Sequence, residues 1–230
     1  MAGVIRYKRL SRKPEAAIFD LDGVLADSEG LHLRAWEVCL QALEIGTSGL
    51  RLEPWVGVAD TEIVVEVIER FALSVTAPEL LERKRMAFGE LVRRELTPFP
   101  GLEAPLRWLG RLLPLAVATA SARREAELML STLGIGGLFQ AVTTGDDVKL
   151  RKPAPDGYLL AAARLGADPL RCLAVEDSPL GIRAAKAAGM QAFAVTTTFS
   201  ADHLIGADRV FPSTAAAIAE IAALAESAPA

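Results

Sequence analysis

Two hydrophobic patterns divide the chain. Between residues 29 and 97, apolar side chains recur at helical spacing and no strand-like run interrupts them. This pattern predicts helices over Ser28–Leu43, Asp60–Phe71 and Ala77–Leu96, with Asp60 or Thr61 as the N-cap of the second helix. We therefore expect this segment to form an all-α unit.

The flanking segments follow a different pattern, in which short apolar runs alternate with amphipathic stretches. The run Ala16-Ala17-Ile18-Phe19 predicts a strand that is buried on both faces. Further strands are predicted over residues 114–119, 139–144, 171–175 and 191–195, and helices over residues 102–112, 121–133, 154–165, 181–188 and 214–225. Such alternation indicates βαβ units and a parallel sheet.

Together the two patterns predict a doubly wound, Rossmann-like α/β core with a helical cap inserted after its first strand. The core comprises residues 14–28 and 98–230, the cap comprises residues 29–97, and residues 1–13 form a basic N-terminal tail. The chain passes between core and cap near Ala26–Gly30 and Thr97–Gly101. We predict that these two segments act as hinges of the cap.

The composition argues against several classes of function. The 230 residues are 51% hydrophobic, yet no apolar run approaches the roughly 18 to 20 residues of a membrane span. A formal net charge of −4 argues against a nucleic-acid-binding protein, which would carry a basic surface. Cys39 and Cys172 are far apart in apolar surroundings, which predicts two buried, reduced thiols in a cytoplasmic protein. We expect a monomer that contacts neither nucleic acid nor membrane.

The first predicted strand ends in an electrostatically unfavourable arrangement. Asp20 and Asp22 follow it, and Gly23 then allows a sharp turn or the close approach of a ligand. Side chains two residues apart on a strand point to the same face, so the two carboxylates repel each other. A divalent cation between them is the simplest remedy, and carboxylate oxygens suit Mg²⁺.

The next strands also end in polar residues. Thr119-Ala120-Ser121 follow the second strand, Lys152-Pro153 lie beyond the third, and Glu176-Asp177-Ser178 follow the fourth. Ligands of an open parallel sheet bind at the carboxyl ends of its strands, so we expect these groups to meet at one edge. The inventory of carboxylates, a hydroxyl beside a helix N-terminus and a lysine is typical of phosphoryl chemistry.

Each member of this set has an expected role. Asp177 joins Asp20 on Mg²⁺, and Lys152 supplies a charge for a phosphate group. Thr119 and the backbone N–H groups that follow it, beginning at Ala120, hold phosphate oxygens, while Ser121 caps the next helix. Asp20 can attack phosphorus to give an aspartyl-phosphate. Asp22 can protonate the leaving oxygen and later deprotonate water.

These motifs resemble those of the haloacid dehalogenase superfamily, and most closely its β-phosphoglucomutase-like phosphatases and mutases. The matching residues are Asp20-Leu21-Asp22-Gly23-Val24, Thr119, Lys152-Pro153-Ala154-Pro155-Asp156 and Glu176-Asp177-Ser178. The resemblance implies that Asp20 is the nucleophile, that Asp22 is the acid and base, and that Thr119 and Lys152 hold the phosphoryl group. It also implies a Mg²⁺ site formed by Asp20, the backbone carbonyl of Asp22, and Asp177, with Glu176 in or near that shell.

The resemblance leaves open whether the enzyme is a phosphatase or a mutase. His32, which opens a His-x-x-Ala-Trp stretch, and Ser121 match substrate contacts of the mutases, although His32 could equally be an interface residue. Val56-Gly57-Val58-Ala59-Asp60 resembles the mutase segment around Gly57 but carries Asp60 where an arginine would grip a second phosphate. Compensation would have to come from other cations, with Lys84, Arg51, Arg85 and Arg123 as the candidates.

We therefore predict a Mg²⁺-dependent phosphatase that acts on a small phosphorylated metabolite, most plausibly a sugar phosphate. A β-phosphoglucomutase is the alternative prediction. A non-catalytic metabolite-binding protein on the same scaffold is the third, because fold does not dictate function.

Overall fold

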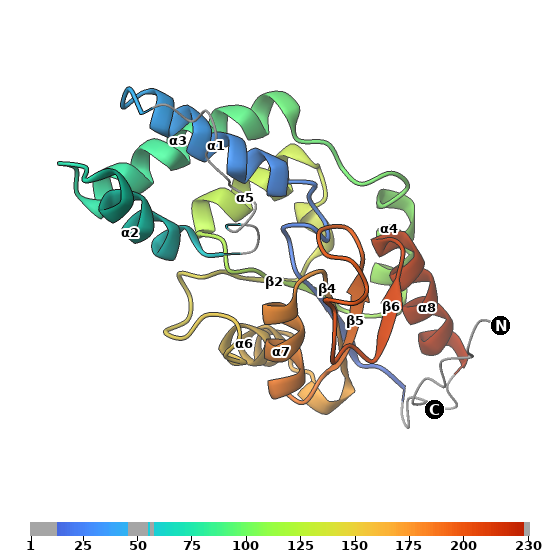
Figure 1. Cartoon of the computed structure of the whole chain (residues 1–230). Coiled ribbons are helices and arrows are strands. Elements are labelled where there is room, and N and C mark those ends of the chain that lie inside the picture. The colour runs from blue at the N-terminus through green and yellow to red at the C-terminus, as the bar shows by residue number, and fades with distance from the viewer. Residues whose placement is uncertain (1–12, 46–54, 56–57, 228–230) are drawn as a thin grey trace.

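The computed structural model describes residues 13–45, 55 and 58–227. Its centre is a six-stranded sheet in the order β3-β2-β1-β4-β5-β6 (Figure 1). The strands are β1 (Ala16–Phe19), β2 (Leu115–Ala118), β3 (Ala141–Thr143), β4 (Cys172–Glu176), β5 (Gln191–Val195) and β6 (Arg209–Phe211). All five pairings are parallel, and β1 lies between β2 and β4. The predicted doubly wound parallel sheet is confirmed.

Helices cover both faces of the sheet, and the two faces differ in side-chain size. One face carries Phe19, Val117 and Phe193 and packs against α4 (Glu103–Leu112), α5 (Arg123–Thr132) and α8 (Thr214–Ser227). The other face carries mainly alanines, among them Ala16, Ala116, Ala174 and Ala192. Because these side chains are small, α6 (Asp156–Leu165) and α7 (Pro179–Ala187) can approach that face closely.

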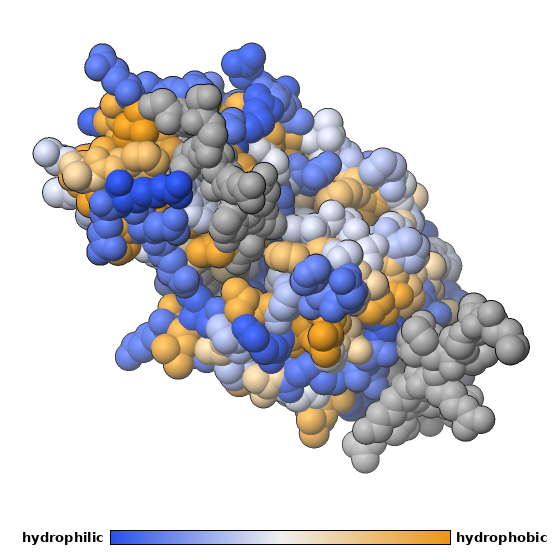
Figure 2. Space-filling view, viewed as in Figure 1, coloured by the Kyte–Doolittle hydropathy of each residue, from blue (hydrophilic) through white to orange (hydrophobic). Residues whose placement is uncertain are grey.

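Three further helices form a separate lobe between β1 and α4 in the sequence. They are α1 (Glu29–Gln41), α2 (Asp60–Phe71) and α3 (Ala77–Glu95). Their own apolar cluster contains Trp36, Trp55, Val67 and Leu80, whereas Phe88 near the end of α3 belongs to the cluster of the core. Figure 2 shows both lobes in space-filling form, with hydrophilic and hydrophobic residues interspersed over this face. The predicted insertion of an all-α cap is confirmed.

The structure corrects several predicted details. The strand β6 was not predicted, because it has only three residues and all three are only partly buried. Neither Asp60 nor Thr61 caps α2, whose N-cap is Ala59. Ser121 does not cap α5 either, since that helix begins at Arg123 after Ala122. The side chains of Asp60 and Ser121 contact ionic partners in the site instead, which are stronger partners than a helix end.

Two smaller expectations concern the cysteines and membranes. Cys39 and Cys172 are both buried and unbridged, as predicted. Within the described residues, no helix combines the length and the apolar character that a membrane span requires. The ends of the other helices differ from the predicted ends by one or two residues, which is the normal scatter of helix termini.

Candidate active site

Three carboxylates and a lysine meet where the central strands end. Asp20 follows β1, and Glu176 and Asp177 lie at the end of the neighbouring strand β4. One oxygen from each of these three residues lies within 4.8 Å of the others. The ammonium group of Lys152 is 2.8 Å from Asp20 Oδ1 and 2.6 Å from Glu176 Oε1. Adjacent parallel strands thus bring together Asp20 and Glu176, which are 156 residues apart in the sequence.

Side chains of the core donate hydrogen bonds to Glu176. Its Oε1 accepts a hydrogen bond from the buried hydroxyl of Tyr158 at 2.8 Å, in addition to the bond from Lys152. Its Oε2 accepts one from Ser178 Oγ at 3.1 Å. A Cβ at Gly181 would lie only 1.8 Å from Glu176 Oε1, so α7 can pass this carboxylate only with a glycine there. Both oxygens of Glu176 therefore already have protein donors.

Gly23 has a comparable role beside Asp177. Its φ is +70°, which favours glycine, and a Cβ there would lie 1.9 Å from Asp177 Oδ2. The sequence predicted either a sharp turn or the close approach of a ligand at Gly23; the structure has the turn, and the group that approaches is the side chain of Asp177. The loop after β1 can therefore reach the carboxylate at the end of β4.

The carboxylate cluster holds more negative than positive charge. Burial raises the pKa of Asp20, and the charges of Glu176 and Asp22 raise it further against the opposing effect of Lys152. Burial, Glu176 and Asp20 raise the pKa of Asp177 well above its ordinary value. No described residue donates a well-aligned hydrogen bond to Asp20 Oδ1. This donor set, which is rich in oxygen and poor in cations, fits a hard divalent cation such as Mg²⁺.

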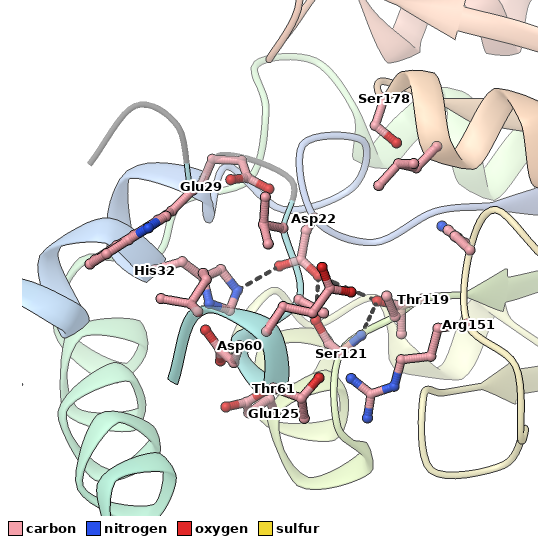
Figure 3. Close-up of a pocket in the computed structure, with 18 of the residues that line it drawn as sticks. Asp22, Glu29, His32, Asp60, Thr61, Thr119, Ser121, Glu125, Arg151 and Ser178 are labelled. Carbon is pink, nitrogen blue, oxygen red and sulfur yellow. Dashed lines mark hydrogen bonds and ion pairs between the residues drawn. The ribbon is translucent and has the colours of Figure 1, made fainter. Parts of the chain in front are cut away.

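Asp22 has a different environment from Asp20. The strand β1 ends at Phe19, so Asp22 lies in the following turn, and its carboxylate is held by groups from two segments, residues 28–32 and residues 119–121. Figure 3 shows His32, Thr119 and Ser121 around it. The donors are Ser28 Oγ at 2.6 Å, Ser121 Oγ at 2.6 Å, His32 Nε2 at 3.1 Å and Thr119 Oγ1 at 3.3 Å. Burial alone would raise the pKa of Asp22, but the bonds from His32, Ser121 and Ser28 and the charge of His32 hold it well below its ordinary value. Asp22 is therefore ionised in this arrangement.

A chain of polar contacts runs from Asp22 into the cap. Lys84 Nζ lies 2.7 Å from His32 Nδ1 and also contacts the carboxylate of Asp60. Because lysine only donates, Nδ1 accepts, and the ring proton is assigned to Nε2, which faces Asp22. Trp36 Nε1 donates to the other oxygen of Asp60 at 2.9 Å. We call Asp22, His32, Lys84 and Asp60 the cap relay.

The surroundings of the cap relay fix its geometry. The His32 ring stacks on Phe88 with a centroid distance of 3.9 Å, and Lys84 is 0% exposed. In this arrangement Lys84 has two partners inside the protein and does not face solvent. It is therefore not placed as the free cation that the sequence offered in compensation for Asp60.

Most of the remaining predicted residues line one cavity of about 170 Å³. Thr119, Ala120 and Ser121 line it together with Asp20, Asp22, His32, Lys152 and Asp177. Arg85 also lines it, whereas Arg123 pairs with Asp147. Gly57 and Arg51 lie outside the described residues.

Sequence reasoning missed three groups of this cavity. Asp60 was treated only as a helix cap or as a missing arginine, although its carboxylate is the partner of Lys84. Glu125 and Arg151 line the cavity and were not predicted. Arg151 directly precedes Lys152, and Glu125 lies one turn beyond Ser121, so closeness to known motifs was the only available signal.

Comparisons with known proteins agree with this geometry. The family model described as haloacid dehalogenase-like hydrolase matches residues 17–195. The chain is 36% identical over 180 residues to the fructose-1-phosphate phosphatase YqaB of Escherichia coli, across 76% of this chain and 93% of that protein. It is 32% identical over 211 residues to the beta-phosphoglucomutase of Bacillus subtilis, across 87% and 90%. The crystal structure of CbbY from Rhodobacter sphaeroides in complex with phosphate aligns with a TM-score of 0.77 and 29% identity, across 88% of this chain and 95% of that one.

Proposed function

This chain belongs to the haloacid dehalogenase-like hydrolases, and we propose that it is a Mg²⁺-dependent phosphatase acting on a small phosphorylated sugar through an aspartyl-phosphate. The observation that carries this proposal is the contrast between Asp20 and Asp22. One lies in a carboxylate cluster with Lys152, and the other is held ionised by four hydrogen-bond donors from both the core and the cap. Two adjacent carboxylates in such different environments suit a nucleophile and a proton carrier.

Asp20 and Asp177 are the proposed side-chain ligands of Mg²⁺, with the backbone carbonyl of Asp22 as a third. Glu176 lies beside them, but both of its oxygens already accept hydrogen bonds, so we assign it to positioning Lys152. Mg²⁺ would stabilise negative charge on the phosphoryl group. Lys152, which the charges of Asp20 and Glu176 keep protonated despite burial, supplies the remaining positive charge.

In the proposed reaction, a carboxylate oxygen of Asp20 attacks phosphorus and the bond from phosphorus to the ester oxygen breaks. Asp22, once protonated, delivers its proton to the leaving oxygen and then removes a proton from the water that hydrolyses the aspartyl-phosphate. Thr119 and the backbone N–H of Ala120 hold phosphate oxygens together with Lys152. The four donors around Asp22 favour its ionised form, which is the form needed for the water step.

We also propose that residues 29–97 open and close over the site as a cap. Ala26 and Pro98, one from each crossing of the chain, form an antiparallel bridge. This contact supports a single hinge made of both segments, because the two crossings lie side by side. The link from Asp22 to His32 would couple closure of the cap to the position of the proposed acid and base.

The test is release of inorganic phosphate from p-nitrophenyl phosphate and a panel of sugar phosphates, with and without Mg²⁺. We expect turnover that requires the cation, and a loss of at least about 1,000-fold in Asp20→Asn, since the amide is not a nucleophile. Asp146→Asn is a matched control, because Asp146 accepts a bond from the backbone at the start of α5 and lies outside the cluster. A fully active Asp20→Asn would exclude the proposed nucleophile.

A phosphomutase is the alternative. His32 and Ser121 favour it, because both side chains contact Asp22. Asp22 would be the acid that protonates the leaving group, and a mutase would require such contacts to it. Against it, Asp60 and Lys84 neutralise each other at the position where a second phosphate would need a free cation. Conversion of β-glucose 1-phosphate to glucose 6-phosphate, stimulated by a bisphosphate, would favour the mutase. Binding of sugar phosphates by calorimetry with no turnover would instead favour a non-catalytic protein.

A further inference from the structure

Glu125 is a buried acid for which neither the fold nor the proposed chemistry provides a role. It lies in the first turn of α5 and is only 7% exposed. Its Oε1 has no hydrogen-bond donor among the described residues. The side chain lines the same cavity as Asp22, Asp60 and Ser121, and Figure 3 shows it in that wall.

An ordinary role in helix capping does not account for this carboxylate. An acid at the third position of a helix commonly accepts a bond from the backbone at the N-cap. At the start of α5, Asp146 accepts from the backbone N–H of Arg123, and no capping side chain is present at Ala122. The positive end of the helix favours the charge of Glu125, yet leaves its Oε1 without a partner.

A buried oxygen without a donor is costly in free energy, because it has lost its hydrogen bonds to water and gained none from the protein. Asp22 and Glu176 show how this protein treats the other carboxylates in the site, since each accepts bonds from several protein donors. Asp20 and Glu125 are the two exceptions among the described residues, and since Mg²⁺ is the proposed partner of Asp20, Glu125 also takes its partner from outside the described chain. A group that enters the cavity is the natural source of such a donor.

We propose that Glu125 is a specificity-determining residue that accepts a hydrogen bond from a hydroxyl group of the substrate. This inference rests on the proposed phosphatase function and specifies its substrate class as a polyhydroxylated phosphate monoester. Glu125 follows Ser121 by four residues, and Ser121 contacts the proposed acid Asp22. The carboxylate of Glu125 therefore contacts the leaving group of the substrate and not its phosphate.

The charge of Glu125 also favours a hydroxyl over other groups. A carboxylate repels a phosphate, whereas an O–H donor to an ionised acceptor makes one of the stronger hydrogen bonds in proteins. An active site with such an acceptor rejects analogues that lack the hydroxyl, because the buried oxygen then remains unpaired. Arg85 lines the same cavity and is the competing donor from the cap.

The experiment compares kcat/KM for two kinds of substrate. One is the sugar phosphate that the wild-type protein hydrolyses best, and the other is p-nitrophenyl phosphate, which offers no hydroxyl donor. In Glu125→Leu we expect kcat/KM to fall about 10- to 100-fold for the sugar phosphate, as a lost bond to a charged group predicts, and by less than about 3-fold for p-nitrophenyl phosphate. Glu125→Gln should lose less, because its amide oxygen still accepts.

Each other outcome overturns a different statement. An equal fall on both substrates would make Glu125 a structural residue and overturn the inference, and activity on p-nitrophenyl phosphate shows that each variant is folded. If Arg85→Met reproduces the selective loss while Glu125→Leu has no further effect in its presence, Arg85 is the partner and the inference fails. Wild-type protein that hydrolyses no phosphate ester would overturn the proposed function itself, and this inference with it.

Discussion

The two halves of the candidate site handle charge in opposite ways. On the core side, the ammonium group of Lys152 contacts Asp20 and Glu176, Asp177 adds a third carboxylate, and the pKa values of Asp20 and Asp177 are raised. On the cap side, the two acidic ends of the cap relay each contact a basic residue. There the pKa of Asp60 is lowered, since Lys84 and His32 outweigh the effect of burial.

The difference indicates which half needs an additional component. Every charged group of the cap relay has a partner within the protein, so its geometry can be maintained by the protein alone. The core half has an excess of negative charge in a buried place, and such an arrangement is stable only with a cation or bound protons. We infer that the core half is built to bind an ion and the cap relay to hold a geometry.

The largest effect should come from breaking the cap relay. Lys84→Met removes the donor that Asp60 and His32 share in a fully buried position. Removing one partner of a buried ion pair typically costs about 3–5 kcal/mol, because the other charge is left uncompensated. Urea unfolding should show this loss in the free energy of unfolding.

A second substitution separates charge from packing at Lys84. In the double variant Lys84→Met with Asp60→Leu, no buried charge is left without a partner, so most of the lost stability should return. A single Lys84→Met variant as stable as the wild type would show that the cap relay does not hold the cap. Arg83→Met on the same helix is the matched control, because Arg83 is exposed.

The excess negative charge of the core half should make the stability of the metal-free protein depend on pH. The raised pKa values of Asp20 and Asp177 mean that the folded protein binds more protons than the unfolded chain above 3.8, the ordinary value for aspartate. Stability of the metal-free protein should therefore fall as pH rises toward neutrality, by up to about 1.4 kcal/mol per pH unit for each such group. The lowered pKa values of Asp22 and Asp60 add stability that is fully present above 3.8 and do not reverse this slope.

Mg²⁺ supplies the control for this measurement. A cation that binds the ionised carboxylates should raise the free energy of unfolding at neutral pH and flatten its slope against pH. Urea unfolding at several pH values between about 5 and 8, with Mg²⁺ and with EDTA, measures both effects. A metal-free protein that grows more stable over this range would contradict the charge excess.

The same two halves differ in how far the sequence predicts them. Asp20, Thr119, Lys152 and Asp177 each follow a strand, and the carboxyl ends of parallel strands meet by topology, so their convergence follows from the hydrophobic pattern. No comparable rule brings Asp60 and Lys84 to His32. Their meeting depends on how three helices pack, and helical spacing gives the buried face of a helix but not its neighbour.

The fold shows the same division. Long, strongly periodic helices such as α2 were predicted with correct bounds, whereas β6 was missed because three half-buried residues carry no clear pattern. Ser121 and Asp60 were assigned to helix caps from local sequence. Both assignments failed because ionic partners distant in sequence compete for these side chains, and local sequence does not contain those partners.

The smallest effect should come from the hydrogen bond that Tyr158 donates to Glu176 in the core half. Tyr158→Phe removes one donor to Glu176 Oε1 and keeps the ring, which lies 5.3 Å from the ammonium of Lys152. A hydrogen bond is worth about 1 kcal/mol, which corresponds to roughly a 5-fold change in an equilibrium or rate. We expect kcat to fall about 5-fold with KM unchanged, because Lys152 loses orientation while the cap contacts to substrate remain. Tyr158→Leu, which also removes the ring, should cost more in stability. A Tyr158→Phe variant with wild-type kcat would show that Glu176 positions Lys152 without the Tyr158 hydroxyl.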